Sequence, residues 1–358
     1  MRATKANFNN ELGVPLTVLG DWEKIEGRHF WLKVIAVSAW RLLVRAEYPE
    51  LLVLEYAADK PGDIGYLLEI ARPYVAAVTA IGDVPVHVEF YSGPEAVARE
   101  KAKVIEALPE NGIAVLNYDD AAVRSMRERT KSRSITYGFS PGADVVIINF
   151  EHRTDDQGKP LGIAFKLNYS GSFVPVRIDG VFGKAQAYAA AAAACIGLSF
   201  GMNLVKIAEA LSFYKSPAGR TQLFEGMKES LVIDDSYNAS PLSMKAAFDA
   251  AHNLKAKRKI GILGDMRELG RFAKQAHEDA GELAANVFDI LITVGQDAKY
   301  IAEAAKEAGM PEKHIFSYDN AGEAKFKAAE ILKKGDLVLV KASHSIGLER
   351  VVEHLKKV

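Results

Sequence analysis

The sequence predicts an α/β protein with two domains and largely parallel sheets, and three observations support this. The chain has 358 residues, more than one ordinary hydrophobic core accommodates. Short β-type apolar runs alternate with helical segments, which is typical of parallel sheets. Pro217 and Gly219 interrupt this pattern, and a second α/β series follows them. We therefore expect one domain over 1–215 and a second over 216–358.

The first domain is expected to combine a mostly parallel sheet with a small β-rich subregion. Its parallel strands are predicted at 50–55, 75–82 and 112–117, and its helices at 94–108, 183–198 and 203–211. Short alternating runs between 135 and 178, broken by Gly, Asp and Ser, predict antiparallel hairpins. The stretch 6–16, with three asparagines around Phe8, predicts a loop.

The second domain is expected to be compact and doubly wound, with a Rossmann-like fold. Its predicted strands are 223–225, 230–233, 259–263, 289–294, a short strand near Ile315, and 337–341. Its predicted helices are 241–253, 273–286, 298–308, 321–332 and one that begins at Leu348. The glycines of 261–270 lack the G-x-G-x-x-G spacing, so a dinucleotide site is not expected.

Residues 30–44 (FWLKVIAVSAWRLLV) predict an amphipathic helix that carries two tryptophans. We expect this helix to pack in the core, and a stripe that faces a membrane surface is the alternative. No run reaches the roughly 18 apolar residues that a transmembrane helix needs. The first residues, MRATK, lack the apolar region of a signal peptide, so we expect a cytoplasmic protein without a transmembrane segment.

The composition gives no electrostatic reason to expect nucleic acid or an anionic membrane as a partner of the whole chain. Lys and Arg number 45 against 46 Asp and Glu, so any phosphate site must be local. The single cysteine, Cys195, cannot form an internal disulfide and fits a reducing compartment, where we expect it to be a buried small hydrophobe. We expect a monomer.

Polar side chains follow several predicted strands, at the edge where open α/β sheets bind ligands. The acidic stretch 234–241 (DDSYNASP) follows the apolar residues 231–233, and a turn that caps the next helix would explain it equally well. Glu55 and His87 could share one hard cation with phosphate oxygens, although a lone histidine is more often structural. By itself, Lys101 reads as a solvated lysine on a helix surface.

A set of motifs occurs in order along nearly the whole chain. They are N-x-N-N-E-x-G-V-P at 7–15, V-L-E-x-x-A-x-x-P-G-D-I at 53–64, H-x-E at 87–89 with a lysine at 101, A-V-L-N-x-D-D at 114–120, G-R at 219–220, D-D-S-Y-N-A-x-P at 234–241 and L-G-D-M-x-E-L-G at 263–270. Together these motifs resemble those of the Mur ligases, and the last two are close to diagnostic of that family.

The resemblance implies an ATP-dependent amide ligase of peptidoglycan precursor synthesis that uses Mg²⁺. Within the family, the motifs are most similar to those of the ligases that join D-Ala-D-Ala to UDP-MurNAc-tripeptide. In that reaction ATP phosphorylates the tripeptide carboxylate, the amine of D-Ala-D-Ala attacks the acyl phosphate, and phosphate leaves. The chemistry requires neutralisation of phosphate charge and the positioning of two anionic substrates.

The resemblance also implies roles for individual residues. Glu55, His87 and Lys101 match the magnesium site, and Lys101 matches a lysine that related ligases carbamylate. His87, Lys101 and Arg220 are implied to act in catalysis, Arg220 by reaching the phosphates when the domains close. The implied nucleotide contacts are Asn117, Asp120, Arg220, Asp235, Tyr237 and Asn238. The implied contacts to the muramoyl-peptide substrate are Asn7, Asn9 and Asn10.

The chain departs from the family pattern in its phosphate-binding region. No G-x-x-x-x-G-K-[ST] occurs in the sequence. We therefore expect a P-loop-NTPase-like central domain that lacks its phosphate loop, in a chain truncated at the N-terminus. Ala80 and 180–184 also differ from the family, and His344 stands where an arginine-like residue is usual. The alternatives are a non-catalytic Mur-ligase-like binding protein, or a related ligase such as folylpolyglutamate or cyanophycin synthetase.

Overall fold

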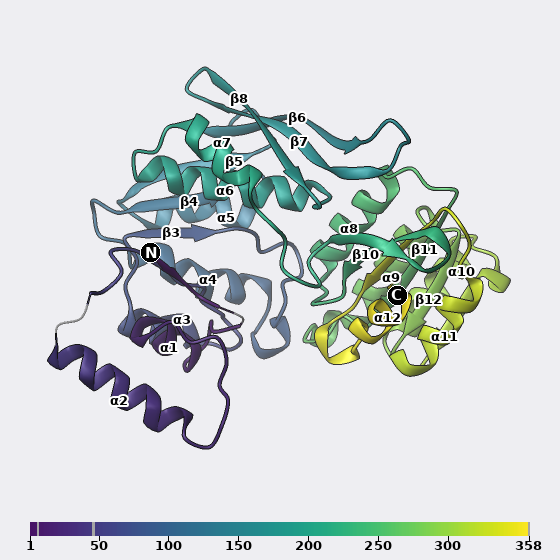
Figure 1. The fold of residues 1–358 in the computed structure, drawn as a ribbon, viewed down its shortest axis with the longest axis horizontal. Helices are drawn as coiled ribbons and strands as arrows, with labels where there is room; N and C mark the ends of the chain where they lie inside the picture. The colour runs from purple at the N-terminus through teal and green to yellow at the C-terminus, as the bar shows by residue number, and fades with distance from the viewer. Residues whose placement is uncertain (6, 45–46, 357–358) are drawn as a thin grey trace.

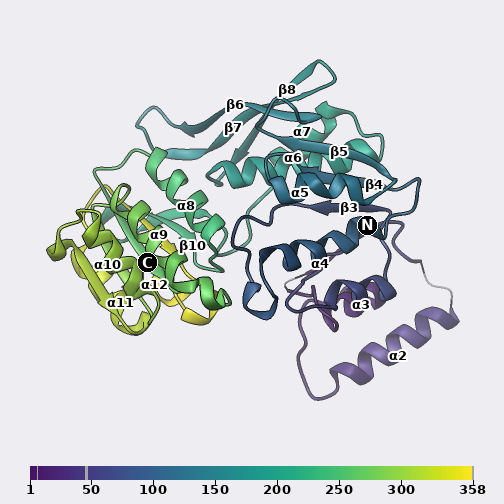
Figure 2. The same ribbon diagram turned by 180° about the vertical axis from the view of Figure 1, so that it is seen from behind.

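A computed structural model describes residues 1–5, 7–44 and 47–356. Two α/β units lie side by side, each built on a six-stranded sheet, and the chain passes from one to the other near residue 216 (Figure 1). The predicted α/β class with mostly parallel sheets is confirmed. The N-terminal segment, with helix α2, projects from the first unit on the side away from its large sheet (Figures 1 and 2).

The first sheet is continuous and changes from parallel to antiparallel along its width. Its strands lie in the order β3 (Val75–Val78), β4 (Ile113–Asn117), β5 (Arg133–Gly138), β6 (Val145–Thr154), β7 (Pro160–Tyr169) and β8 (Ser172–Asp179). The pairings from β3 to β6 are parallel, and β6, β7 and β8 pair as antiparallel neighbours. The expected antiparallel hairpins are therefore present. The prediction of an antiparallel hairpin strand around Ile135 was wrong, because β5 pairs in parallel with both β4 and β6.

Helices cover both faces of this sheet. Helix α6 (Lys184–Ser199) packs on one face, and α4 (Pro94–Glu106) and α5 (Ala121–Ser125) lie near β3 and β4 on the other. Helix α6 is followed by α7 (Leu204–Ser212), which packs on β8. The small alanine side chains of α6 let it approach the sheet closely, and Cys195 is fully buried among them as expected. Burial raises the pKa of its thiol to about 12, which keeps it protonated and unreactive.

The N-terminal region differs most from the sequence-based expectation. A helix, α1 (Gly13–Leu19), lies where a loop was predicted, and the side chain of Asn10 accepts a hydrogen bond from the Gly13 amide at its start. The predicted strand at 50–55 shrinks to β2 (Leu52–Val53), which pairs only with β1 (Arg2–Ala3). Because β2 lies outside the large sheet and is partly exposed, the expectation that the strand before Glu55 belongs to the main parallel sheet was wrong.

Helix α2 (Phe30–Leu43) forms as predicted, but most of it does not pack in the core. Only Phe30 and Val34 are buried, and they contact a small cluster around Leu16. The expectation of core packing was wrong for the rest of the helix, because no other described element covers it. After β2 the chain enters α3 (Asp63–Ile70), which packs against α4.

The second unit is a doubly wound sheet, as predicted. Its strand order is β13 (Ile315–Tyr318), β12 (Ile290–Val294), β11 (Arg258–Gly264), β14 (Asp336–Lys341), β10 (Ser230–Asp235) and β9 (Gln222–Gly226), and only β9 is antiparallel to its neighbour. The helices between these strands are α8 (Pro241–Asn253), α9 (Ala273–Ala285), α10 (Ala298–Glu307), α11 (Ala321–Ile331) and α12 (Glu349–Leu355). The strands β10 and β14 therefore end side by side.

The two units share part of one hydrophobic core. Val88, Val97 and Phe182 of the first unit are buried in the same cluster as Ile233 and Phe248 of the second. Shared burial of this kind restricts how far the units can move apart without exposing apolar surface. None of the described helices is long and apolar enough to cross a membrane.

Candidate functional site

Four polar side chains gather on the first unit where it faces the second. Glu55 and Asp59 come from the segment after β2, His87 from the loop after β3, and Lys101 from α4. His87 Nε2 lies 3.3 Å from Asp59 Oδ1. Lys101 interacts electrostatically with both Asp59 and Glu55. The fold thus brings together Glu55, His87 and Lys101, which lie far apart in the sequence, and adds Asp59.

The second unit contributes Glu268 to this cluster. Its Oε2 lies 2.5 Å from His87 Nδ1, at an angle that leaves Nδ1 without a hydrogen bond. His87 has a φ of 67° and Glu268 a φ of 64°, so both residues adopt the left-handed conformation that non-glycine residues rarely occupy. The Glu89 amide also donates to the Glu268 carbonyl at 3.3 Å. The contact therefore joins the H-x-E segment to the L-G-D-M-x-E-L-G loop across the domain boundary.

The Lys101 ammonium is in an environment that disfavours its charge. Burial lowers its pKa from the ordinary lysine value of 10.5, and the nearby carboxylates of Asp59 and Glu55 offset only part of this effect. A lowered pKa increases the fraction of neutral amine, which is the form that acts as a nucleophile. The solvated helix-surface lysine that the sequence alone suggested is therefore wrong for this position.

The three N-terminal asparagines have different environments. Asn9 Nδ2 donates to Glu55 Oε1 at 3.3 Å, so this loop reaches the acidic side of the cluster. Asn10 Oδ1 accepts from the amides of Leu12 and Gly13, which ties its side chain to the start of α1. Asn7 is exposed. Of the three, Asn9 is the one that the structure joins to the cluster.

Asn117 and Asp120, the expected nucleotide contacts of the first unit, have hydrogen bonds within the protein. Asn117 Nδ2 donates to the Thr79 carbonyl at 2.8 Å. Asp120 caps α5, and its Oδ2 accepts from the amides of Ile81 and Gly82 at 2.8 and 3.0 Å. These two side chains therefore hold the loop after β3 against the end of β4, and they position the segment that leads to His87.

On the second unit, Asp235 and Lys341 form a buried ion pair at the ends of β10 and β14. Lys341 Nζ donates to Asp235 Oδ2 at 2.6 Å and to the Asn238 carbonyl at 2.9 Å. Asp235 Oδ1 accepts from the Thr221 amide at 3.0 Å. The pair fixes the turn after β10 and the start of β9, and its charge is largely neutralised inside the protein.

Two side chains, the guanidinium of Arg220 and the imidazole of His344, lie against the ring of Tyr237. The Arg220 guanidinium carbon is 4.1 Å from the centroid of the Tyr237 ring, and the His344 ring stacks at 5.4 Å. The Tyr237 amide donates to the Gly219 carbonyl at 3.2 Å, so the linker and the D-D-S-Y-N segment are joined directly. The structure therefore places Arg220, Tyr237 and His344 in one stack at the linker. His344, which stands where the family usually has an arginine-like residue, stacks its imidazole ring on the Tyr237 ring.

The donors around Lys101 fit a magnesium ion that completes its coordination with water and phosphate. Among the described residues, no three His, Cys, Asp or Glu side chains stand close enough to hold a metal unaided. Mg²⁺ in phosphoryl-transfer sites is bound by one or two carboxylates together with waters and substrate phosphates. Glu55 is exposed and the Asp59 side chain is 54% exposed, so both carboxylates are accessible to such an ion.

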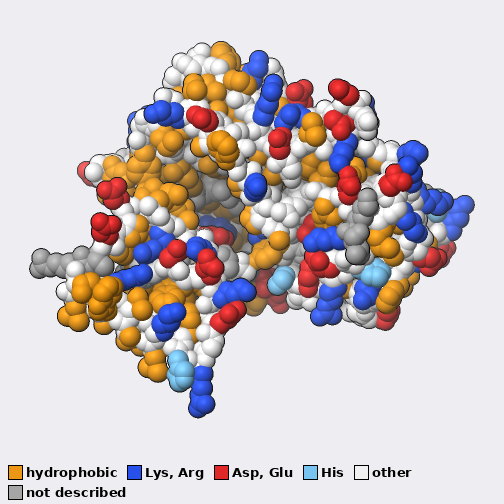
Figure 3. Space-filling view, viewed as in Figure 1, with side chains coloured by type: hydrophobic (Ala, Val, Ile, Leu, Met, Phe, Trp, Pro, Cys, Tyr) orange, Lys and Arg blue, Asp and Glu red, His pale blue; other side chains and the backbone are white. Residues whose placement is uncertain are grey.

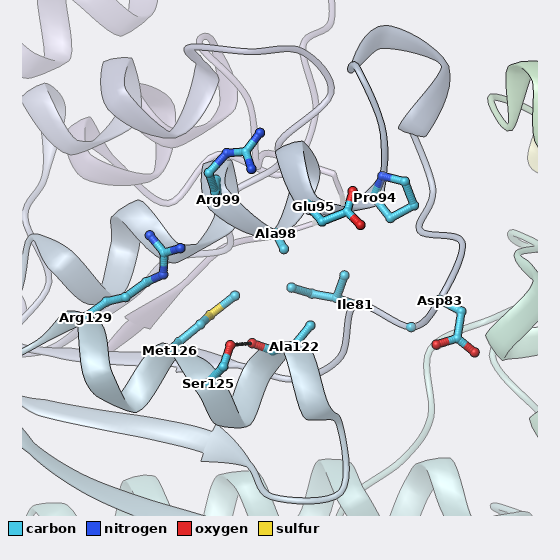
Figure 4. A pocket seen from close by; sticks show the side chains of 11 residues that line it. Ile81, Asp83, Pro94, Glu95, Ala98, Arg99, Ala122, Ser125, Met126 and Arg129 are labelled. Carbon is cyan, nitrogen blue, oxygen red and sulfur yellow. Dashed lines mark hydrogen bonds between the residues drawn. The ribbon is translucent and has the colours of Figure 1, made fainter.

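A separate pocket of about 500 Å³ lies on another side of α4. Arg99 and Arg129 stand at one end of it, and Asp83 lies at the other (Figure 4). The Ser125 hydroxyl donates to the Ala122 carbonyl on its floor at 2.8 Å (Figure 4). None of the expected site residues lines this pocket, although Asp120 holds the backbone of Ile81 and Gly82 at its edge.

Sequence reasoning missed Asp59, Glu268 and Lys341. Each lies in or beside a motif that was recognised, but spacing along the chain does not show which side chain of a motif turns toward a site. Asp59 follows Glu55 by four residues in one irregular segment, and Glu268 lies within L-G-D-M-x-E-L-G. Lys341 ends a predicted strand, which the sequence shows, but only the structure pairs that strand with the strand of Asp235.

Family models match both units of the chain. The Mur ligase middle domain matches residues 33–197, and the Mur ligase, glutamate ligase domain matches residues 219–344. The chain is 32% identical to the UDP-N-acetylmuramoyl-tripeptide--D-alanyl-D-alanine ligase of Mycobacterium tuberculosis (strain CDC 1551 / Oshkosh), over 99% of this chain and 67% of the relative. It is 29% identical to the ligase of the same name from Bacillus subtilis (strain 168), over 98% and 69% respectively.

A solved structure agrees with these sequence matches. The MurF ligase from Thermotoga maritima, determined in complex with ADP, aligns with a TM-score of 0.79 and 28% identity. The alignment covers 99% of this chain and 73% of that chain. The likeness extends over both units, so it includes the arrangement of the two sheets as well as each sheet by itself.

Proposed function

The chain belongs to the Mur ligase family, and we propose that it is the ATP-dependent ligase that adds D-Ala-D-Ala to UDP-MurNAc-tripeptide. The observation that carries this proposal is the cluster of Glu55, Asp59, His87 and Lys101 on the first unit, which Glu268 of the second unit meets. In a reaction between a nucleoside triphosphate and two other substrates, groups from both domains can act on the same phosphate when the site lies at the boundary between the domains.

The cluster supplies carboxylates, an imidazole and a lysine for the metal side of a phosphoryl transfer to a carboxylate. The G-x-x-x-x-G-K-[ST] loop that would hold the β- and γ-phosphates does not occur in this sequence. The tripeptide carboxylate attacks the terminal phosphate of ATP and ADP leaves, then the amine of D-Ala-D-Ala attacks the acyl phosphate and inorganic phosphate leaves. Mg²⁺ bound beside Glu55 and His87 would offset the negative charge on the phosphate oxygens. Lys101 lies in the same region on α4. Its neutral amine would add carbon dioxide and release one proton to form a carbamate, whose oxygens would be further ligands for the ion.

We assign the nucleotide to the side of the stack made by Arg220, Tyr237 and His344. In this assignment the aromatic faces would stack on a base or a ribose, and the Arg220 guanidinium beside the Tyr237 ring would donate bidentate hydrogen bonds to phosphate oxygens. Asn238 stands beside this stack, where Lys341 holds its carbonyl. Asn117 and Asp120 serve as positioning residues, because their hydrogen bonds support the loop that leads to His87.

Asn9 supports a role for the N-terminal loop in substrate binding, because its amide reaches Glu55. Direct contacts from Asn7 and Asn10 to the muramoyl peptide stay predictions, as do the monomeric state and the cytoplasmic location.

Phosphate release from ATP tests the proposal. We expect release only when UDP-MurNAc-tripeptide and D-Ala-D-Ala are present together. Phosphate release that depends on glutamate as the amine would instead indicate the folylpolyglutamate reaction. Release that depends on aspartate and arginine would indicate the cyanophycin reaction. Tight substrate binding without any turnover would indicate the non-catalytic binding protein.

Two variants make this test specific to the cluster. Lys101→Arg keeps the positive charge but cannot form a carbamate, and we expect it to lower the rate at least about a hundredfold. Lys103→Arg is the matched control, since Lys103 lies on the same helix and pairs with Glu100, and it should leave the rate unchanged. Equal rates for Lys101→Arg and Lys103→Arg would show that Lys101 has no role in the reaction.

A further inference from the structure

His87 of the first unit has a carboxylate beside each of its two ring nitrogens, and the two carboxylates come from different units. Glu268 Oε2 of the second unit lies 2.5 Å from His87 Nδ1. Asp59 Oδ1 of the first unit lies 3.3 Å from His87 Nε2, on the side of the ring that faces the acidic cluster. The ring therefore stands between the metal side of the cluster and a side chain of the other unit.

The Nδ1 atom of His87 has Glu268 as the partner within its reach. Nδ1 is buried and has no hydrogen bond among the described residues, because the short contact with Glu268 Oε2 is out of line. A buried polar atom without a hydrogen bond costs free energy. The Glu268 side chain is 43% exposed, so it has the freedom to turn and accept a hydrogen bond from Nδ1.

The backbone at both residues is strained. His87 has a φ of 67° and Glu268 a φ of 64°, in the left-handed region that residues with a Cβ rarely occupy. Such conformations persist where the surrounding structure enforces them, and they are concentrated at functional sites. Two strained residues whose side chains meet across a domain boundary indicate a contact with a function.

The loop that carries Glu268 is fixed to the body of the second unit. The Met266 amide donates to Nε2 of His277, which is fully buried, at 2.9 Å. The Arg267 amide donates to Ser343 Oγ, also at 2.9 Å. Because hydrogen bonds hold the two residues before Glu268, its carboxylate moves with the second unit as a whole.

The segments around His87 and Glu268 also pack against each other. The Glu89 amide donates to the Glu268 carbonyl at 3.3 Å. Val88 is 2% exposed and belongs to the same hydrophobic cluster as Met266. Figure 3 shows the two units of Figure 1 in contact along the middle of the molecule. Separation of the units would take Glu268 away from His87 and expose Val88, so the contact depends on docking of the units.

The arrangement is the one that commonly supports a histidine that binds a metal. Such a histidine binds the metal through one ring nitrogen and donates the hydrogen on the other nitrogen to a carboxylate, which fixes the orientation of the ring. Glu268 faces Nδ1 of His87, and this leaves Nε2 for an ion on the side of Asp59.

We propose that Glu268 is a positioning residue, which orients the His87 imidazole so that Nε2 faces the magnesium ion when the two units are docked. The inference rests on the proposed function, which supplies the ion. It makes the metal site of the first unit depend on the position of the second. Metal binding and docking are then coupled, and each favours the other by the same free energy.

Mn²⁺ in place of Mg²⁺ tests this role without turnover, because electron paramagnetic resonance detects a nitrogen atom bound to Mn²⁺. We expect the full chain with Mn²⁺ and ADP to show coupling to one imidazole nitrogen, and His87→Ala to remove it. Glu268→Ala should weaken the Mn²⁺ affinity about tenfold or more. Glu268→Gln keeps an oxygen that accepts from Nδ1, and it should restore most of the affinity.

Two further variants separate the orientation of His87 from folding. Glu268→Gly removes the carboxylate but suits the left-handed backbone, so it should weaken Mn²⁺ binding without lowering the unfolding free energy. Glu282→Ala removes an exposed carboxylate from α9 of the same unit, and it should change neither quantity.

The role of Glu268 is rejected if Glu268→Ala keeps both the wild-type Mn²⁺ affinity and the nitrogen coupling of His87. It is also rejected if the wild-type protein shows no such coupling. A different result would reject the ligase reaction by itself. In that case the wild type shows the coupling and Glu268→Ala weakens it, but no phosphate is released from ATP, and the role of Glu268 at the metal site is supported.

Discussion

At the scale of single residues, the environment of Lys101 combines burial with the charges of two carboxylates from another segment. Lys101 is buried, and the carboxylates of Asp59 and Glu55, from the segment after β2, act on its charge. His87 stands beside Asp59 and is met by Glu268 from the other unit. Burial lowers the pKa of this amine, so it loses its proton more easily than an exposed lysine does. A lysine reacts with carbon dioxide as the neutral amine.

Because the pKa of Lys101 is lowered in the folded protein, we expect the unfolding free energy to vary with pH in the alkaline range. The folded protein releases the Lys101 proton at a lower pH than the unfolded chain, whose value is the ordinary 10.5. Between those two values the unfolded state binds more protons, so the unfolding free energy rises with pH. Below that window the unfavourable contribution of the charged amine is constant.

Urea unfolding across alkaline pH measures this effect as a difference between proteins. Lys101→Met should lack the part of the rise that belongs to Lys101, whereas Lys103→Met should keep it. Identical pH profiles for wild type and Lys101→Met would show that Lys101 titrates as an ordinary lysine.

At the scale of elements, the helices of the second unit follow their predicted bounds closely, and the starts of α8 and α11 are encoded locally by side-chain caps. Ser240 caps α8, and its side chain and that of Ser243 bond reciprocally to the backbone. The D-D-S-Y-N-A-x-P segment therefore has both of the roles weighed from the sequence. Its end is a helix cap, and its start carries Asp235 and Tyr237 toward the linker.

Ser240→Ala should lower the unfolding free energy by about 1 kcal/mol, since the amide of Ser243 loses its acceptor. Ser240→Thr keeps a hydroxyl at the same place and should cost much less. Chemical denaturation of the two variants measures the difference, and an alanine variant as stable as the threonine variant would mean that water replaces the cap.

The first unit is less predictable from local signals. Leu52–Val53 forms only a short edge strand, although the apolar run around it reads as a buried strand, because the pairing partner is Arg2–Ala3 and not the large sheet. The β5 run alternates like a hairpin strand, yet it joins the parallel part through β4 and β6. In both cases the partner strand decides the outcome, and periodicity does not identify the partner.

At the scale of the whole molecule, the linker between the two units carries a conformational requirement. Gly219 has a φ of 71°, and a Cβ there would stand 2.9 Å from the Tyr237 Cβ. Glycine is therefore required twice at this position, for the left-handed backbone and for the close approach of Tyr237. The stack of Arg220, Tyr237 and His344 depends on that approach.

Gly219→Ala should be compared with Gly309→Ala. Gly309 also has a positive φ, of 101°, but a Cβ at that position would meet no atom within 4 Å, so its substitution costs only the backbone term of about 1–2 kcal/mol. Gly219→Ala adds overlap with Tyr237, about 1–3 kcal/mol more, and should raise the KM for ATP. Denaturation and steady-state kinetics measure both, and equal effects for the two variants would contradict the requirement for close approach.

The sequence by itself determined the α/β class, the second unit almost element by element, and the motifs that hold Glu55, His87, Lys101 and Asp235. These follow from local patterns of hydrophobicity, caps and turns, and from residues that stand at strand ends. Only the tertiary structure decided that Asp59 and Glu268 join the cluster, that Asn117 and Asp120 support a loop, and that α2 is exposed. The physical reason is that side-chain contacts and burial depend on which segments meet in space, and the order of residues along the chain does not specify those meetings.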